Sequence, residues 1–474
     1  MRFLTVSNQI LFIYYVLSNL IYLGLLIVAI SRNVRHHHRL GSFRFELIKA
    51  SPFTPPITLI VPAHNEERSI VSSVGALLGL DYPSLEVIVV NDGSTDATVE
   101  RLQKAYDLRT ARILYIADIA TAPVRAIYRS PVEPRLFVLD KQGAGCKADA
   151  INAGINAATS PYVCVVDADS ILERESLVRI MVGVLSDPGR VIAVGGIVRV
   201  LNGSRVVDNQ IEQVRLPKRP IEVMQVIEYL RAFLVGREGW ATFNMLPIIS
   251  GAFGIFQRDL VKQVGGFRTH AVGEDLDLVI RMHRRLLEEH RPYHITFIPD
   301  PTCWTEVPTD LKSLARQRAR WHKGLIDALW PNRDMLFRAR YGRVGWLILP
   351  YMWIFEFLAP VIELVGYVTI ILAMVLGVLS KAFFLQFLLF GYAFATLISI
   401  GSVLLEEMTV RRYANWREVA RLLIYCLFEH FPYRQMTMVW RLQGLWQYLR
   451  GDLQWGTMKR VGISANPSQA TSHE

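Results

Sequence analysis

Residues 162–169 read YVCVVDAD, a short apolar run that ends in an Asp-x-Asp. An apolar run of this length without a helical period is typical of a strand buried in a parallel sheet. Such a strand would bring Asp167 and Asp169 to the sheet edge at which open α/β sheets bind their ligands. Carboxylate oxygens are the ligands that Mg²⁺ and Mn²⁺ prefer, and a metal there can neutralise the charge on a diphosphate.

The same pattern extends in both directions from this stretch. Further strands are predicted at residues 57–61, 85–91, 136–139 and 191–195. Helices are predicted at residues 66–78, 96–106 and 147–157. Strands that alternate with helices predict an α/β domain with a mostly parallel sheet.

Polar residues follow the other predicted strands as well. The first loop, residues 62–67, reads PAHNEE, and the second, residues 91–96, reads NDGSTD. Because the carboxyl ends of parallel strands share one sheet edge, these loops and the Asp-x-Asp should converge on one crevice. Residues 143–147, GAGCK, add flexible backbone and the Lys147 cation, which suit a phosphate or a nucleobase, although the glycines could simply begin a helix.

Two later motifs also carry reactive groups. Residues 273–277, GEDLD, place three carboxylates before an amphipathic helix; they could cap that helix, or one could serve as a general base. Gln317, Arg320 and Trp321 fall on one helix face at i, i+3 and i+4, which suits a diphosphate and a stacked sugar ring. An interfacial helix with a Trp anchor would explain Trp321 and the arginines but not Gln317.

Apolar residues make up 51% of the 474 residues and are gathered into spans. Residues 11–30 form a run of about 30 Å, and the chain continues into Arg32 and Arg35, which indicates a retained anchor followed by a cytoplasmic region. The net charge is +10, and the dense groups of basic residues lie beside apolar segments. This pattern predicts binding to a membrane surface and no binding to nucleic acid. The four cysteines show no CxxC spacing, so neither a zinc site nor a disulfide framework is predicted.

The apolar stretch at residues 347–379 is too long for one crossing. We expect an interfacial piece at 346–357, a crossing at 358–379 and a return at 383–405. Glu356 and Glu363 share a helix face in this region: Glu356 could lie at the interface, or both could line a path for a polar polymer.

These spans divide the chain into five parts. They are an N-terminal transmembrane anchor with a basic juxtamembrane segment (1–50), a cytoplasmic catalytic domain (51–300), interfacial helices (301–357), a transmembrane helix pair (358–405), and an interfacial or re-entrant segment with a cytoplasmic tail (406–474).

The ordered set of motifs resembles the family 2 inverting glycosyltransferases of the membrane-embedded, processive type, such as cellulose, chitin, hyaluronan and poly-N-acetylglucosamine synthases. The resemblance implies a GT-A type nucleotide-sugar-binding domain inserted between transmembrane helices. It also implies transfer from a UDP-sugar, with glucose or N-acetylglucosamine favoured, to a growing β-linked polysaccharide at a bacterial inner membrane. Alternatives are addition of a single sugar to a lipid or lipid-linked acceptor, or a non-catalytic assembly subunit of an exopolysaccharide system. A partner subunit or a homo-oligomer is also left open.

The resemblance assigns roles residue by residue. Asp275 corresponds to the general base, and Asp167 and Asp169 correspond to the ligands of Mg²⁺ or Mn²⁺. The residues that bind the donor are then Pro62, Ala63, Glu66, Asp92, Lys147, Asp167, Gln317, Arg320 and Trp321. Those that bind the acceptor are Ser250, Gly251, Ala252 and Trp321, and those of a gating segment are Trp455, Gly456 and Thr457.

Overall fold

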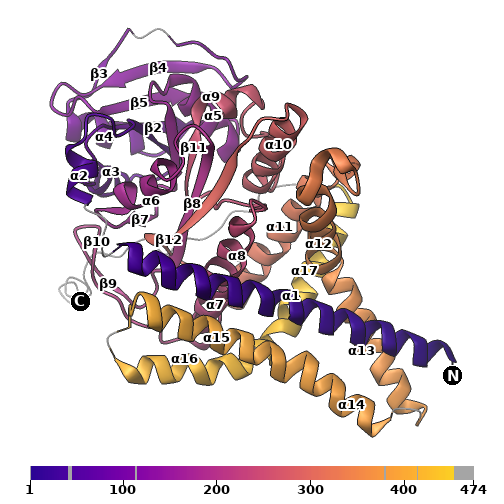
Figure 1. Ribbon diagram of the computed structural model, residues 1–474. Helices are drawn as coiled ribbons and strands as arrows, with labels where there is room; N and C mark the ends of the chain where they lie inside the picture. Colours follow the sequence, from indigo (N-terminus) through magenta and orange to yellow (C-terminus); the bar gives the residue numbers. More distant parts are fainter. Residues whose placement is uncertain (1, 41–44, 113–114, 378–379, 414, 453–474) are drawn as a thin grey trace.

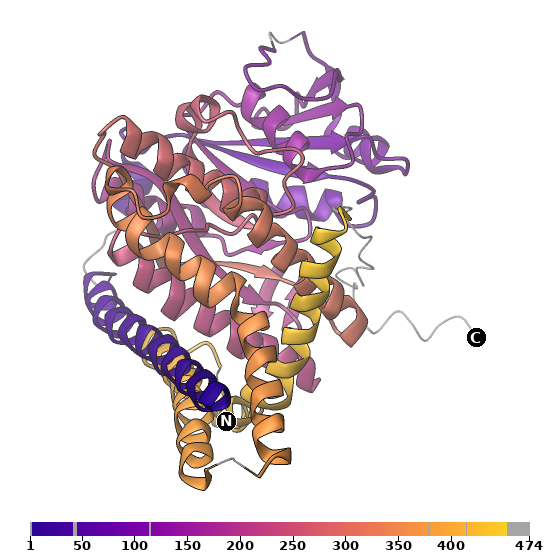
Figure 2. The same ribbon diagram turned by 90° about the vertical axis from the view of Figure 1, so that its right-hand side faces the viewer.

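The computed structural model describes residues 2–40, 45–112, 115–377, 380–413 and 415–452. A ten-stranded sheet with its covering helices forms one end of the molecule (Figure 1). The long helices α1 (Arg2–Leu40), α13 (Ala359–Val375) and α15 (Phe394–Thr409) extend away from it, and a view turned by 90° has the same arrangement (Figure 2).

The sheet is of the mostly parallel α/β kind that the sequence predicts. In spatial order its strands are β3 (Arg109–Thr110), β4 (Val124–Arg129), β5 (Leu136–Lys141), β2 (Leu85–Asp92), β1 (Ile57–Ala63), β6 (Tyr162–Val166), β11 (Phe253–Gln257), β8 (Val191–Val200), β12 (His294–Thr305) and β7 (Ile171–Leu172). A separate hairpin pairs β9 (Arg205–Val207) with β10 (Gln210–Gln213).

Strands β5, β2, β1 and β6 are parallel neighbours, and β11 enters antiparallel between β6 and β8. The sequence pattern did not predict β11. Ile57 of β1 lies opposite both Leu85 of β2 and Tyr162 of β6, so these three strands end at the same edge.

The predicted helices flank this sheet. They are α3 (Ile70–Leu78), α4 (Thr98–Tyr106) and α5 (Lys147–Ala157), joined by α6 (Ser176–Leu185), α9 (Arg258–Gln263) and α10 (Glu274–Glu288). A Cβ on Gly154 of α5 would lie 2.5 Å from Ile60, so this glycine lets the helix sit directly on β1. Helix α3 starts four residues later than predicted, and in the turn before it the amides of Glu66 and Glu67 donate to Thr98 Oγ1 and Asp96 Oδ2.

The remaining α-helices are α2 (Phe45–Ala50), α7 (Pro220–Leu230), α8 (Glu238–Thr242), α11 (Leu311–Leu329), α12 (Leu349–Tyr351), α14 (Lys381–Leu388), α16 (Trp416–Phe428) and α17 (Arg434–Leu449). Among them, α8 packs against α1, and α11 packs against α17. Short π-helical turns lie at Arg231–Arg237, Val344–Ile348, Met352–Phe357, Leu389–Ala393 and Glu429–Tyr433, and 3₁₀ turns at Arg333–Met335 and Ala339–Tyr341.

Within the described residues, two helical segments are long and apolar enough to cross a membrane, Ser7–His36 and Phe384–Thr409. A third candidate is the pair Val344–Phe357 and Ala359–Val375, which bends by 47° between its two parts. This bend lies where the sequence predicts an interfacial piece to meet a crossing. Helix α1 packs along α13 and α15, so the candidate spans are neighbours.

A buried ion pair ties the sheet to the candidate spans. Arg199 of β8 and Glu406 of α15 are 6% and 1% exposed, and Arg199 Nη2 donates to Glu406 Oε2 at 2.9 Å. Two charges buried this deeply are tolerated only because they neutralise each other.

Replacing Arg199 by Met should therefore destabilise the fold by about 3–5 kcal/mol, because Glu406 is left buried without a partner. The double variant Arg199→Met/Glu406→Leu should recover most of that loss. As the control, Arg205→Met breaks an exposed pair with Glu212 and should cost less than about 1 kcal/mol. Unfolding of the detergent-solubilised protein measures all three. A double variant no more stable than Arg199→Met would contradict this account.

Candidate active site

The first two predicted loops interlock at the carboxyl edge of the sheet. Pro62 and Ala63 end β1, and His64 Nδ1 lies 2.9 Å from the carbonyl oxygen of Asp92, the last residue of β2. Glu66 follows on the same loop, where its carboxylate accepts a hydrogen bond from Ser69 Oγ. The predicted nucleotide-binding residues Pro62, Ala63, Glu66 and Asp92 thus lie on two adjoining loops.

Asp92 is fixed by a residue that the sequence analysis missed. Lys141 ends β5 and is fully buried, with its Nζ 2.5 Å from Asp92 Oδ1 and 2.6 Å from Asp149 Oδ2. The amide of Ala144 donates to the same Asp92 oxygen at 3.1 Å. Although burial lowers the pKa of Lys141, its hydrogen bonds to the carboxylates of Asp149 and Asp92 hold that pKa above its ordinary value. Lys141 therefore stays charged and orients Asp92.

The loop at residues 143–147 also packs closely against the second loop where two glycines meet. Gly93 has a φ of +65°, and a Cβ on it would lie 2.6 Å from the amide nitrogen of Gly143. Only glycine fits both the backbone conformation and the close approach. This contact brings the start of α5, with Lys147, against the loop that carries Asp92.

Lys147 connects the groups that the sequence analysis singled out. Its Nζ forms an ion pair with Asp167 Oδ1 and donates to the carbonyl oxygen of Gly251 at 2.9 Å. The amide of Gly251 in turn donates to Asp275 Oδ2 at 3.3 Å. Burial lowers the pKa of Lys147, but Asp167, Glu274 and Asp275 raise it more, so it lies above its ordinary value.

Two packing contacts bring these groups together. Phe253 of β11 lies opposite Val166 of β6, so Ser250, Gly251 and Ala252 come directly beside Asp167. Helix α10, which carries Asp275, begins against α11: a Cβ on Gly273 would lie 2.6 Å from the carbonyl oxygen of Gly324. The predicted base, the acceptor-binding stretch and the predicted metal ligand Asp167 therefore meet around Lys147.

The motif on α11 is split between its interior and its surface. Gln317 is buried and accepts a hydrogen bond from Arg318 Nη1 at 3.1 Å, whereas Trp321 is 44% exposed. The Arg318 guanidinium lies 4.1 Å from the centre of the Trp321 ring and pairs with Glu228 at 2.6 Å. Arg320 is one of the charges that act on Glu274. Arg318 was not predicted, yet it fixes both Gln317 and Trp321.

Arg237 is a third cation that the sequence analysis missed. Its guanidinium lies 3.7 Å from the centre of the Phe233 ring, and its buried Nη1 has no hydrogen-bond partner within the described residues. Burial lowers its pKa to about 10, and the charge of Asp275 opposes that shift. A buried donor beside Asp275 is suited to an anionic or hydroxyl-bearing ligand.

The residues at the Asp-x-Asp fit a divalent metal. Within the described parts of the chain, no three His, Cys, Asp or Glu side chains gather into a complete metal site. Mg²⁺ and Mn²⁺ need only one or two carboxylates when phosphates and waters complete their coordination, and Asp167 and Asp169 supply two at the end of β6. The predicted gating residues Trp455, Gly456 and Thr457 lie outside the described residues.

Residues 162–400, half of the chain, match the family described as glycosyl transferase family group 2, and residues 58–265 match glycosyl transferase family 2. The chain belongs to glycosyltransferase family 2. The resemblance stated from its motifs is therefore confirmed, and the protein is an enzyme of this family.

Among the known proteins that are similar to this glycosyltransferase are two curated relatives and one solved structure. "Probable glycosyltransferase YdaM" of Bacillus subtilis is 30% identical over 275 residues, 57% of this chain and 55% of the relative. "Poly-beta-1,6-N-acetyl-D-glucosamine synthase" of Staphylococcus epidermidis is 25% identical over 308 residues, 62% of this chain and 64% of the relative. The alignments thus span little more than half of the curated relatives' lengths. A solved structure, "Mannosyltransferase PcManGT from Pyrobaculum calidifontis in complex with GDP-Man and Mn2+", is 18% identical with a TM-score of 0.49, covering 91% of this chain and 99% of the other.

If Asp275 is the general base of this glycosyltransferase, Asp275→Asn should lower turnover by about 10²–10⁴-fold because the acceptor hydroxyl loses its proton acceptor. UDP binding, measured by calorimetry, should persist. Glu289→Gln, which changes an exposed carboxylate just beyond the end of the same helix, is the control and should keep full activity. Full turnover by Asp275→Asn would refute the assignment.

Glu274 makes a pH-dependent contribution to the stability of this glycosyltransferase. Burial, and next the charge of Asp275, raise its pKa from 4.5 to about 7. Between these values the folded state binds more protons than the unfolded state, so stability falls as the pH rises.

Glu274→Gln cannot ionise, so it should raise the unfolding temperature more at about pH 8 than at about pH 5. Thermal unfolding of both proteins at the two pH values measures the difference. An equal shift at both pH values would contradict the raised pKa of Glu274.

Proposed function

We propose that this family 2 glycosyltransferase transfers glucose or N-acetylglucosamine from a UDP-sugar to a growing β-linked polysaccharide at the cytoplasmic face of a membrane. The observation that carries the proposal is the convergence of Asp167, Lys147, Gly251 and Asp275 through short contacts at one sheet edge. Support for the acceptor class comes from relatives named poly-β-1,6-N-acetylglucosamine synthases.

In the proposed reaction Asp275 removes the proton from an acceptor hydroxyl, whose oxygen forms a bond to the anomeric carbon of the donor as the bond to UDP breaks. Attack opposite the leaving group inverts the anomeric configuration. Lys147 is positioned to pair with the diphosphate, and Trp321 offers a ring face to the terminal acceptor sugar. A divalent metal bound by Asp167 and Asp169 would neutralise charge on the departing UDP.

A polar cavity supports an extended acceptor. It has a volume of about 240 Å³ and is bordered by α1, α7, α13 and α17. Its lining contains four arginines that are each paired with a glutamate: Arg318 with Glu228 at 2.6 Å, Arg231 with Glu429 at 2.8 Å, Arg434 with Glu363 at 2.5 Å and Arg441 with Glu356 at 3.8 Å.

The charge balance of this cavity suits an uncharged, hydroxyl-rich chain. Glu356 also accepts hydrogen bonds from Tyr351 and Tyr22 at 3.1 and 3.3 Å. The cavity begins at Arg318, which stacks on Trp321, and reaches Glu363 of the candidate span α13. Glu356 and Glu363 both line this cavity, which supports the path for a polar polymer that the sequence analysis left open.

The test uses the full chain in lipid nanodiscs with UDP-glucose or UDP-N-acetylglucosamine, with Mn²⁺ or Mg²⁺ or with a chelator. We expect UDP release that the chelator abolishes, together with a large product cleaved by a β-specific glycosidase. A single-sugar lipid product would replace the polymer proposal by transfer to a lipid-linked acceptor. No UDP release under any condition would contradict the proposed UDP-sugar donor.

Ala232 lines the cavity without contributing a charge, so Ala232→Trp tests the path separately from the donor site. The variant should shorten the product, because an indole fills much of the cavity, while the initial rate of UDP release stays within about twofold of the wild type. Ala339→Trp, at an exposed position outside the cavity, is the control. Products of unchanged length from Ala232→Trp would contradict the path.

A further inference from the structure

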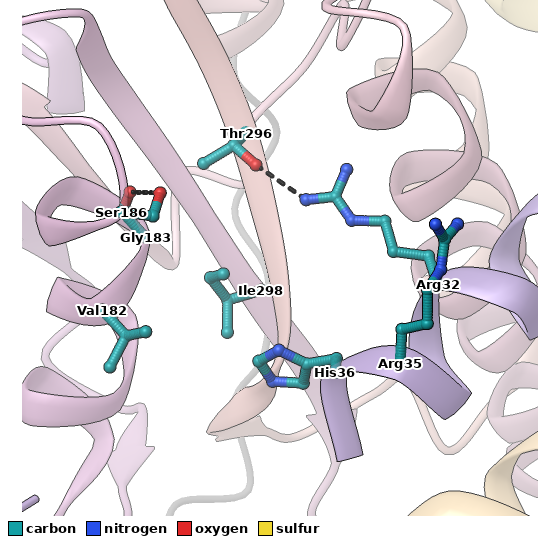
Figure 3. Close-up of a pocket in the computed structure, with 8 residues that line it drawn as sticks. All are labelled: Arg32, Arg35, His36, Val182, Gly183, Ser186, Thr296 and Ile298. Carbon is teal, nitrogen blue, oxygen red and sulfur yellow. Dashed lines mark hydrogen bonds between the residues drawn. The ribbon is translucent and has the colours of Figure 1, made fainter. Parts of the chain in front are cut away.

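A second pocket lies away from the active site, between the end of α1 and the sheet domain. It has a volume of about 320 Å³. Figure 3 shows Ile298 of β12 between Val182 of α6 on one side and Arg32 and Arg35 of α1 on the other. None of these residues belongs to the motifs that form the donor site. The pocket therefore needs an explanation of its own.

The pocket combines an apolar floor with a cationic rim. Val182 and Ile298 contribute the floor, and Arg32 is a fixed part of the rim. The Nε of Arg32 lies 2.8 Å from Glu238 Oε1, and its Nη2 donates to Thr296 Oγ1 at 3.0 Å. Because Glu238 and Thr296 bind its guanidinium, Arg32 is held in place. It also keeps the Thr296 hydroxyl at the pocket.

Arg35 is the adaptable cation of the rim. Its Nε donates to the carbonyl oxygen of Ser31 at 3.0 Å, which is its one hydrogen bond within the described residues. The side chain is exposed, so its two terminal amino groups can meet a ligand at the pocket mouth. A guanidinium fork matches the geometry of phosphate oxygens. The rim therefore favours a phosphate over an uncharged ligand.

The position of the pocket indicates where that phosphate comes from. Exposed apolar side chains run along α1 at Ile13, Leu17, Leu20, Ile27 and Val34, on one face of the helix. The stripe ends one residue before Arg35. If α1 crosses the membrane as proposed above, lipid chains cover this stripe and the pocket lies at headgroup level.

We propose that this pocket binds the headgroup phosphate of an anionic phospholipid, with Arg35 as the main cation and the Val182–Ile298 floor against the glycerol and upper acyl chain. A zwitterionic headgroup brings its own ammonium to a rim that already carries arginines, so an anionic lipid is preferred. A soluble sugar phosphate fits poorly because its hydroxyls would face the apolar floor. The inference rests on the proposed membrane placement but not on sugar transfer.

Lipid retention by the purified full chain tests the proposal. The protein is placed in nanodiscs of phosphatidylcholine with a minor share of phosphatidylglycerol, then released into detergent, and the lipids that stay bound are counted by native mass spectrometry. The wild type should retain phosphatidylglycerol over phosphatidylcholine. Arg35→Gln should lower that preference about fivefold, the effect of one arginine near an anionic surface, and Arg35→Lys should recover part of it.

Two further variants separate the pocket from general surface charge. Arg343→Gln removes an exposed arginine beside another apolar segment and should change the preference less than twofold. Ser186→Phe narrows the pocket, which Ser186 also lines, without altering any charge and should lower retention as Arg35→Gln does. Equal losses in Arg35→Gln and Arg343→Gln would overturn the proposal, as would displacement of the lipid by inorganic phosphate at matched ionic strength. Because the readout counts lipid, failure of the polymer proposal would leave the result intact.

Discussion

The architecture of the candidate active site depends on one half-buried cation, Lys147. Three carboxylates surround it, at Asp167, Glu274 and Asp275, and its hydrogen bond to Gly251 brings the chain between α8 and β11 into the same cluster. Taking an ammonium out of water is unfavourable unless opposite charges replace its hydration. The positive charge of Lys147 stabilises the three carboxylates at this position. The negative charges of the carboxylates in turn keep Lys147 protonated. A diphosphate entering this cluster would exchange one set of anions around Lys147 for another.

Charged side chains are paired differently in the cavity beside α11 and in the pocket at the end of α1. The cavity beside α11 pairs each of its arginines with a glutamate and leaves a polar, charge-balanced lining. The pocket at the end of α1 instead leaves Arg35 available. The pocket at the end of α1 and the active site adjoin where the π-helical turn Arg231–Arg237 meets α8. Glu238 of α8 pairs with Arg32 of the pocket, and the charge of Asp275 acts on the preceding residue, Arg237. The packing of α1 against the sheet domain and the active site therefore share one short stretch of chain.

Much of this could be predicted from the sequence, because short apolar runs and the loops after them are local signals. Strand β6 and helix α5 have the predicted bounds, and Asp167 lies directly after its strand. Strand β11 was missed because it is short and contains Gly254, which weakens the strand pattern in the sequence. Lys141, Arg237 and Arg318 were missed because a charged residue reads as solvent-exposed in sequence, and only tertiary packing reveals the carboxylate or aromatic ring that each one meets. The domain boundaries and residue roles remain predictions.

The central claim is that the groups around Lys147 form the donor site, and the most direct measurement is an experimental structure of the full chain with UDP and Mn²⁺, with manganese located by anomalous scattering. The account predicts one manganese peak bonded to carboxylate oxygens of Asp167 or Asp169 and to the diphosphate, with the uracil against the loops that carry Ala63 and Asp92. Nucleotide bound at any other edge of the sheet, or manganese away from both aspartates, would contradict it.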